Sequence, residues 1–160
     1  QSNYQVRFDW GAAGASAIAV DADAVVWIDE LGEEPVPDLP DVVAGSIASS
    51  AAVARWSLVR QEQLGGRFRI AVVAAGVTGS DGAVRFAVED LLAAGAVIEA
   101  IAAVGIDHQS PEAAAAAAAY TGLRQAARHL ISASVSSREL GKPAFDLTPV
   151  DDVIQLRPAD

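Results

Sequence analysis

The sequence predicts an α/β fold with three layers, α/β/α, in which a mostly parallel sheet carries helices on both faces. Continuous apolar runs at residues 24–28 (AVVWI) and 68–74 (FRIAVVA) are typical of strands that are buried on both sides. Longer stretches rich in alanine separate and follow these runs, so that strands and helices alternate along the chain. We expect residues 1–160 to form a single domain, because one core can serve a chain of this length.

The first half of the chain contains four predicted strands. A short strand at residues 6–8 leads through Asp9 to a helix at 12–20, and the apolar run 24–28 stops at Asp29 and Glu30. Three prolines make residues 31–40 an irregular connection. A short strand at 41–44, a turn at Gly45 and Ser46, and a helix from about 48 to 63 follow. The strand at 68–74 completes this half.

The second half is predominantly helical. After residues 75–76 a polar loop leads into a helix that contains Glu89 and Asp90 and ends near residue 105. Ser110, Pro111 and Glu112 have the cap, the proline and the acid of a helix start, and seven alanines follow them. A further helix is expected at 123–133 and a last strand at 153–156.

Glu89 and Asp90 are the two acids that a plain amphipathic helix does not explain. If residues 79–101 are read as helical, every residue three, four or seven positions from Asp90 is apolar. A buried carboxylate without a partner is costly, so we expect a cation, a hydrogen-bond donor or a metal beside Asp90. Glu89 has Arg85 one turn earlier as its expected partner. The alternative is that both acids form the solvated edge of a surface helix.

Composition limits the classes of partner. The net charge is −10 and the eleven basic residues are scattered, so neither a nucleic acid nor a membrane surface is an expected partner. The absence of cysteine excludes disulfides and cysteine-bound zinc, and it fits a cytoplasmic location. No apolar run is long enough to span a bilayer. Helices with so much alanine offer little polar surface, which favours a homodimer.

Acids follow the predicted strands at the edge where parallel sheets bind their ligands. Asp9 follows the first strand and Asp29 the second, while Ser46 follows the third. Carboxylates and hydroxyls without cysteine are the donors that Mg²⁺ prefers, and Mg²⁺ can polarise a bound phosphate for attack by water. The alternative for Asp9 and Asp29 is that each caps the turn or helix that follows it.

Several motifs, taken in order, resemble the 2-phosphosulfolactate phosphatase family. The most specific are VRFDWG at 6–11 and SDGAVRFAVEDLLAAGAVI at 80–98, and the others are AGSIASSAAVA at 44–54, IAVVAAG at 70–76, SPEAAAAAAA at 110–119 and SSREL at 136–140. The resemblance implies an α/β/α fold and a magnesium-dependent hydrolase that acts on the phosphate monoester of a small sulfonated hydroxy acid in coenzyme M biosynthesis. The family's long segment after the second strand is missing here, as are its Arg-Asn and Glu-Arg-Trp groups.

Two hypotheses follow from the retained and the missing residues. In the first, the chain is a Mg²⁺-dependent phosphatase that hydrolyses a small phosphorylated hydroxy acid. In the second, it is a catalytically degenerate relative that serves as a ligand-binding or assembly module. For the first hypothesis the residues are catalytic Asp9, Asp29 and Arg85; substrate-binding Ser46, Arg85 and Arg138; and metal-binding Asp9, Asp29, Glu89 and Asp90.

Overall fold

The fold is built on a five-stranded sheet in the order β1-β4-β2-β3-β7. This computed structural model describes residues 1–32 and 34–159. Strands β1 (Val6–Trp10), β4 (Ile70–Ala74), β2 (Ala24–Ile28) and β3 (Val42–Gly45) are parallel, and β7 (Gln155–Arg157) pairs with β3 in the antiparallel sense. The predicted α/β class with a mostly parallel sheet is confirmed.

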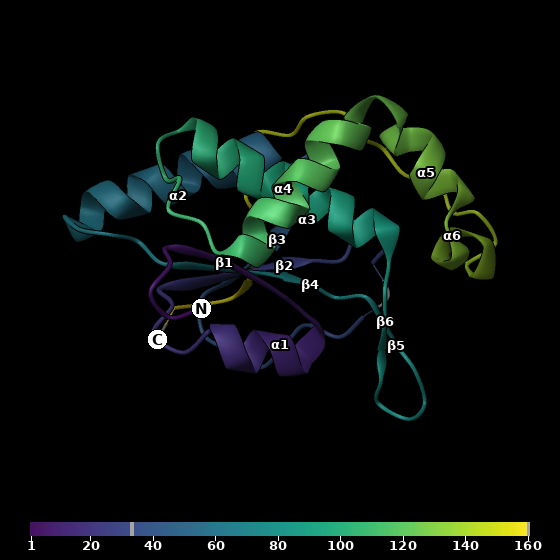
Figure 1. Ribbon diagram of the computed structural model, residues 1–160, viewed down its shortest axis with the longest axis horizontal. Coiled ribbons are helices and arrows are strands. Elements are labelled where there is room, and N and C mark those ends of the chain that lie inside the picture. The colour runs from purple at the N-terminus through teal and green to yellow at the C-terminus, as the bar shows by residue number, and fades with distance from the viewer. Residues whose placement is uncertain (33, 160) are drawn as a thin grey trace.

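Helices pack on both sides of this sheet (Figure 1). Helix α1 (Gly11–Ile18) covers one side, where Ala15 and Ile18 join a core with Val25, Trp27 and Val73. Helices α2 (Ser50–Leu64), α3 (Val88–Ala103) and α4 (Pro111–Leu123) cover the other side (Figure 1). Since side chains alternate along a strand, β2, β3 and β4 each supply both cores: in β2, Val26 and Ile28 face α3, whereas Val25 and Trp27 face α1.

Helix α3 is the central helix of the larger core. It is buried along most of its length, and it crosses α4 closely at Gly95, where an added Cβ would lie 2.2 Å from the carbonyl oxygen of Ala116. Only a glycine permits that approach. Helix α4 begins as predicted: Pro111 is its first residue, and the Ser110 hydroxyl accepts a hydrogen bond from the N–H of Ala113 at 3.1 Å.

Residues 79–87 differ from the sequence prediction. Instead of a helix that already includes residue 83, β5 (Val77–Thr78) and β6 (Val84–Arg85) form an antiparallel hairpin, and α3 begins only at Val88. The turn of the hairpin is fixed by Gly82, with φ of 79°, and by the hydrogen bond from the N–H of Gly79 to the oxygen of Ala83. Arg85 is therefore not one helical turn before Glu89.

The C-terminal third contains shorter elements than predicted. The expected helix at 123–133 is divided into a 3-10 turn, Arg124–Ala126, and α5 (Ala127–Ala133), after which α6 (Val135–Glu139) follows. The last strand begins two residues later than expected. In the part of the chain that the structure describes, no helix is both long and apolar enough to cross a bilayer.

Candidate functional site

The carboxyl group of Asp90 joins the ends of the two central strands. One oxygen accepts the backbone N–H of Glu30, just after β2, at 2.9 Å, and the other accepts the N–H of Gly76, just after β4, at 2.8 Å. Asp90 itself is 2 % exposed, in the first turn of α3. Of the three partners expected beside a buried Asp90, namely a cation, a hydrogen-bond donor or a metal, the structure shows hydrogen-bond donors. The backbone supplies two of them.

Burial raises the pKa of two acids at this edge, Asp90 and Glu30. Desolvation raises the pKa of Asp90 to about 8; the nearby charges of Asp29 and Glu89 raise it further, while the two N–H donors act in the opposite direction. Desolvation likewise raises the pKa of Glu30 to about 7, against the hydrogen bond from the N–H of Ile47. Near neutral pH Asp90 therefore retains its proton and Glu30 is about half protonated, so a metal cation that binds either carboxylate would have to displace a proton.

Of the acids at this edge, Glu89 is the one whose buried position is least explained by contacts within the protein. Its side chain is buried, at 2 % exposure, and within the described residues no hydrogen-bond donor reaches its Oε2 atom. The predicted pairing with Arg85 is wrong, because Arg85 lies in the hairpin and forms an ion pair with Glu139 instead. A buried carboxylate oxygen without a donor lowers the stability of the fold unless it binds another partner, such as a cation.

A cavity of about 80 Å³ lies beside these acids. Asp29 lines it after β2, Gly76 after β4, and Glu89 and Asp90 at the start of α3. The β5–β6 hairpin and α6 lie on the same side of the molecule, next to the start of α3 (Figure 1). Among the described residues, the lining consists of Asp29, Leu31, Glu34, Gly76, Val77, Glu89, Asp90, Ser136, Glu139 and Leu140.

The lining is acidic. Among the described residues that line it, five are Asp or Glu and none is Lys or Arg. An anion alone would be repelled from such a cavity, whereas a cation would be attracted. Within residues 1–32 and 34–159, however, no three His, Cys, Asp or Glu side chains are placed to hold a metal ion as a ready-made cage. We refer to this lining as the acidic cavity.

Asp29 has a local structural role at the edge of the acidic cavity. Its two oxygens accept the backbone N–H groups of Gly32, at 2.9 Å, and Glu34, at 2.8 Å, so the side chain closes the loop after β2. This is the capping role that the sequence left open as an alternative. Asp29 thus both closes this loop and lines the acidic cavity.

Asp9 lies apart from the other predicted ligands. Strand β4 separates β1 from β2, so Asp9 and Asp29 are not on neighbouring strands. The Asp9 carboxylate accepts the N–H of Trp10 at 2.8 Å and lines a different cavity, together with Leu91 and Glu112. The structure brings Asp29, Glu89 and Asp90 together, without Asp9.

The predicted anion-binding residues lie outside the acidic cavity. The Ser46 hydroxyl bonds to the hydroxyl of Ser49 at 3.0 Å, in the turn before α2. Arg138 is exposed in the last turn of α6, and its neighbour Glu139 pairs with Arg85 rather than with Arg138. The side chain of Arg85 contacts the cavity lining through its ion pair with Glu139.

Three polar side chains of the described lining were not predicted as site residues: Glu34, Ser136 and Glu139. Ser136 and Glu139 belong to the SSREL motif, in which only Arg138 was predicted as a site residue. Glu34 belongs to the proline-rich connection, where no pattern distinguishes it from the other acids. Glu30 was noted at a strand end, which is the one signal that could have marked it as part of this edge.

Comparison with known protein families and curated proteins found no relative of this chain. No protein-family model matches the chain, and no curated protein matches it. The function of the chain therefore has to be inferred from the site itself.

Proposed function

We propose that the chain is a Mg²⁺-dependent phosphomonoester hydrolase of the three-layer α/β/α type, similar to 2-phosphosulfolactate phosphatase, that acts on a small phosphorylated hydroxy acid. The observation that carries this proposal is the Glu89 Oε2 atom, buried and without a donor among the described residues, in a cavity lined by acids. The resemblance of the motifs supplies the reaction class.

The donor set of the acidic cavity fits Mg²⁺. This ion keeps several of its waters and is usually held by only one or two carboxylates, so it does not need a cage of three protein ligands. Glu89 would bind it through the unpaired oxygen, and Asp29 would contact it directly or through water. When bound, the ion would supply charge neutralisation and polarisation of a phosphate oxygen.

The other residues of this edge act by positioning and by neutralising charge. Asp90 fixes the ends of β2 and β4 relative to α3, so it is a positioning residue for the cavity. Arg85 is held at the rim by Glu139, in a pair that is largely exposed to solvent. Because exposed pairs are weak, Arg85 can exchange Glu139 for a phosphate at small cost. The Ser136 hydroxyl is the neutral polar group of the lining.

A second candidate is a catalytically degenerate relative that binds a cation or a ligand without turnover. The size of the acidic cavity favours it: about 80 Å³ holds an ion with some water, whereas pockets for small molecules are generally about 300 Å³ or more. A phosphorylated substrate would enter only if α6 or the β5–β6 hairpin moved outward. The two candidates thus differ in whether substrate is turned over, not in whether cation binds.

The deciding experiment is a phosphate-release assay on a panel of small phosphorylated hydroxy acids, with MgCl₂ or with EDTA. The parent is compared with Glu89→Gln and with Glu99→Gln, a control that removes an exposed carboxylate from the same helix. Magnesium-dependent release that Glu89→Gln abolishes and Glu99→Gln preserves supports the hydrolase. Magnesium binding without release of phosphate from any compound supports the degenerate relative.

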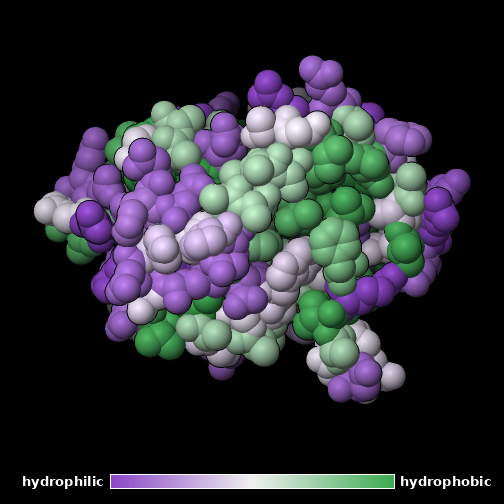
Figure 2. All heavy atoms as spheres, in the orientation of Figure 1, coloured by the Kyte–Doolittle hydropathy of each residue, from purple (hydrophilic) through white to green (hydrophobic). Residues whose placement is uncertain are grey.

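The homodimer and the cytoplasmic location are parts of the same proposal. Figure 2 shows apolar side chains gathered on the face that α4 presents, where Ala114, Ala115, Ala118 and Leu123 are exposed. Light scattering on the parent and on Ala115→Glu tests the dimer. A dimeric parent and a monomeric variant would support this face as the interface, and a monomeric parent would refute it.

A further inference from the structure

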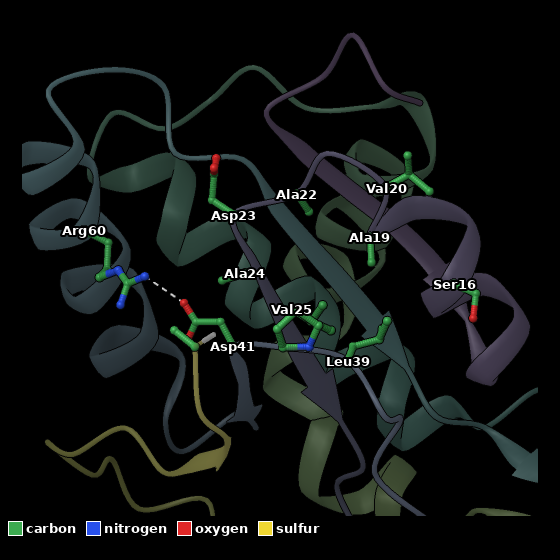
Figure 3. Close-up of a pocket in the computed structure, with 12 residues that line it drawn as sticks. Ser16, Ala19, Val20, Ala22, Asp23, Ala24, Val25, Leu39, Asp41 and Arg60 are labelled. Atoms are coloured by element: carbon green, nitrogen blue, oxygen red, sulfur yellow. Dashed lines mark hydrogen bonds and ion pairs between the residues drawn. The ribbon is translucent and has the colours of Figure 1, made fainter.

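A larger cavity lies at the opposite edge of the sheet, where the parallel strands begin. It has a volume of about 390 Å³, within the range of about 300 to 1,000 Å³ that is usual for small-molecule pockets. Ala24 and Val25 of β2, Leu39 and Asp41 before β3, and the end of α1 line it, and Arg60 of α2 closes one side (Figure 3). We call it the amino-edge cavity. None of the described residues that line it also lines the acidic cavity.

Arg60 is held in a fixed position at this cavity. Its guanidinium carbon lies 5.5 Å from the ring centroids of both Trp56 and Phe68, and its Nη2 donates to the Asp41 carboxylate at 2.7 Å (Figure 3). A guanidinium has five N–H donors. Within the described part of the chain only Asp41 accepts one of them, so Arg60 has further donors for a ligand and a position that is already determined.

Asp41 is the strained partner that holds Arg60. It has φ of 48°, in the left-handed region, and is 4 % exposed. Its second oxygen accepts the side-chain N–H of Gln155 at 2.9 Å, and its backbone bonds to Val25 and Pro158. Backbone strain of this kind occurs at ligand clamps and persists only where the surroundings enforce it. Both Asp41 oxygens are used within the protein, and the Ser16 hydroxyl, which also lines the cavity, donates to the oxygen of Ala12. Among the described lining residues, Arg60 is therefore the side chain with unused donors for a ligand.

The remaining walls determine what kind of molecule fits. Most of them are apolar, formed by Ala19, Val20, Val25, Leu39 and Pro40 among others. Asp23 is paired with Arg69 at 3.3 Å, so among the described lining residues the charges of Asp23 and Asp41 are each matched by an arginine, and neither presents an unmatched negative charge to an anion. We propose that the amino-edge cavity binds a small amphipathic carboxylic acid, with the carboxylate on Arg60 and the apolar chain against Val25 and Leu39.

Two probes of equal chain length test this assignment in an NMR titration of the amide signals. Hexanoate carries the carboxylate that Arg60 would bind, and hexanol lacks it. We expect millimolar hexanoate to shift the signals of Val25 and Leu39, and hexanol to bind about tenfold more weakly, because a charge-assisted hydrogen bond is lost. In Arg60→Leu that difference should disappear. Arg55→Leu is the matched control, because Arg55 lies on the same helix, pairs with the exposed Asp151 and does not line the cavity.

A second variant keeps the test valid if loss of the Arg60–Asp41 pair unfolds the chain. Ala19→Leu fills the cavity from the end of α1 and leaves that pair in place, so it should abolish the binding of both probes. Hexanoate that leaves the signals of the lining residues unchanged would overturn the proposal. Equal binding of hexanoate to the parent and to Ala19→Leu would overturn it too. This site is independent of the proposed hydrolase, so neither result bears on the other.

Discussion

Replacement of Asp90 by asparagine tests whether this carboxyl keeps its proton in the folded protein. Burial raises its pKa from the usual 3.8 to about 8. Between these two values the unfolded chain releases the proton and the folded chain retains it, so the folded state binds more protons and loses stability as the pH rises. The loss is up to about 1.4 kcal/mol per pH unit, or about 1 to 3 kcal/mol between about pH 5 and about pH 7.

Asparagine has the same shape but does not titrate. Its oxygen can accept the N–H of Glu30 or of Gly76, while its amide nitrogen faces the other donor, at a cost of about 1 to 3 kcal/mol at every pH. Asp90→Asn should therefore be less stable than the parent near pH 5, and the difference in the free energy of unfolding should shrink by about 1 to 3 kcal/mol near pH 7.

Urea denaturation of both proteins across this pH range measures that difference. Asp152→Asn, at an exposed position, controls for the general loss of a negative charge. A difference that stays constant or widens as the pH rises would refute the reasoning. It would show that the two N–H donors and the start of α3 outweigh burial and keep Asp90 ionised.

Three further predictions concern packing and capping, and urea denaturation measures each. Gly95→Ala should destabilise the fold by about 1 to 3 kcal/mol, because the new Cβ meets the Ala116 carbonyl oxygen at 2.2 Å; an unchanged midpoint would show that α4 can shift away. Gly122→Ala, in α4 with open space around it, should stabilise by about 0.5 to 1 kcal/mol, and destabilisation there would contradict the helical account. Ser110→Ala should cost about 1 kcal/mol by removing the cap on Ala113, and no loss would mean that the hydroxyl contributes nothing.

The strands with continuous apolar runs could be located from the sequence, because a short, continuous apolar run fits few structures other than a strand buried on both faces. The run at 24–28 is β2, and the run at 68–74 contains β4. The β5–β6 hairpin could not be located, because strands of two residues carry no periodicity. Its turn signals were present at Gly79 and Gly82, but the apolar residues between that turn and α3 also fitted a helix.

The site was predictable only in part. The rule that ligands bind beyond the carboxyl ends of parallel strands placed Asp29 at the correct edge, and the apolar surroundings of Asp90 correctly indicated a buried carboxyl. The separation of Asp9 followed from the insertion of β4 between β1 and β2, which is a long-range pairing without a local signal. The Arg85–Glu139 pair joins residues 54 positions apart, and only the fold brings them together.

The most direct test of the central claim, that the acidic cavity binds a divalent cation through Glu89, is isothermal calorimetry with MgCl₂. It requires the parent, Asp29→Asn, Glu89→Gln and the exposed control Glu99→Gln. We expect the parent and the control to bind Mg²⁺, Glu89→Gln to lose binding, and Asp29→Asn to lose or weaken it, because Glu89 carries the unpaired buried oxygen beside Asp29. Absence of binding in the parent, or equal binding in Glu89→Gln, would contradict the account and would leave these acids with a structural role alone.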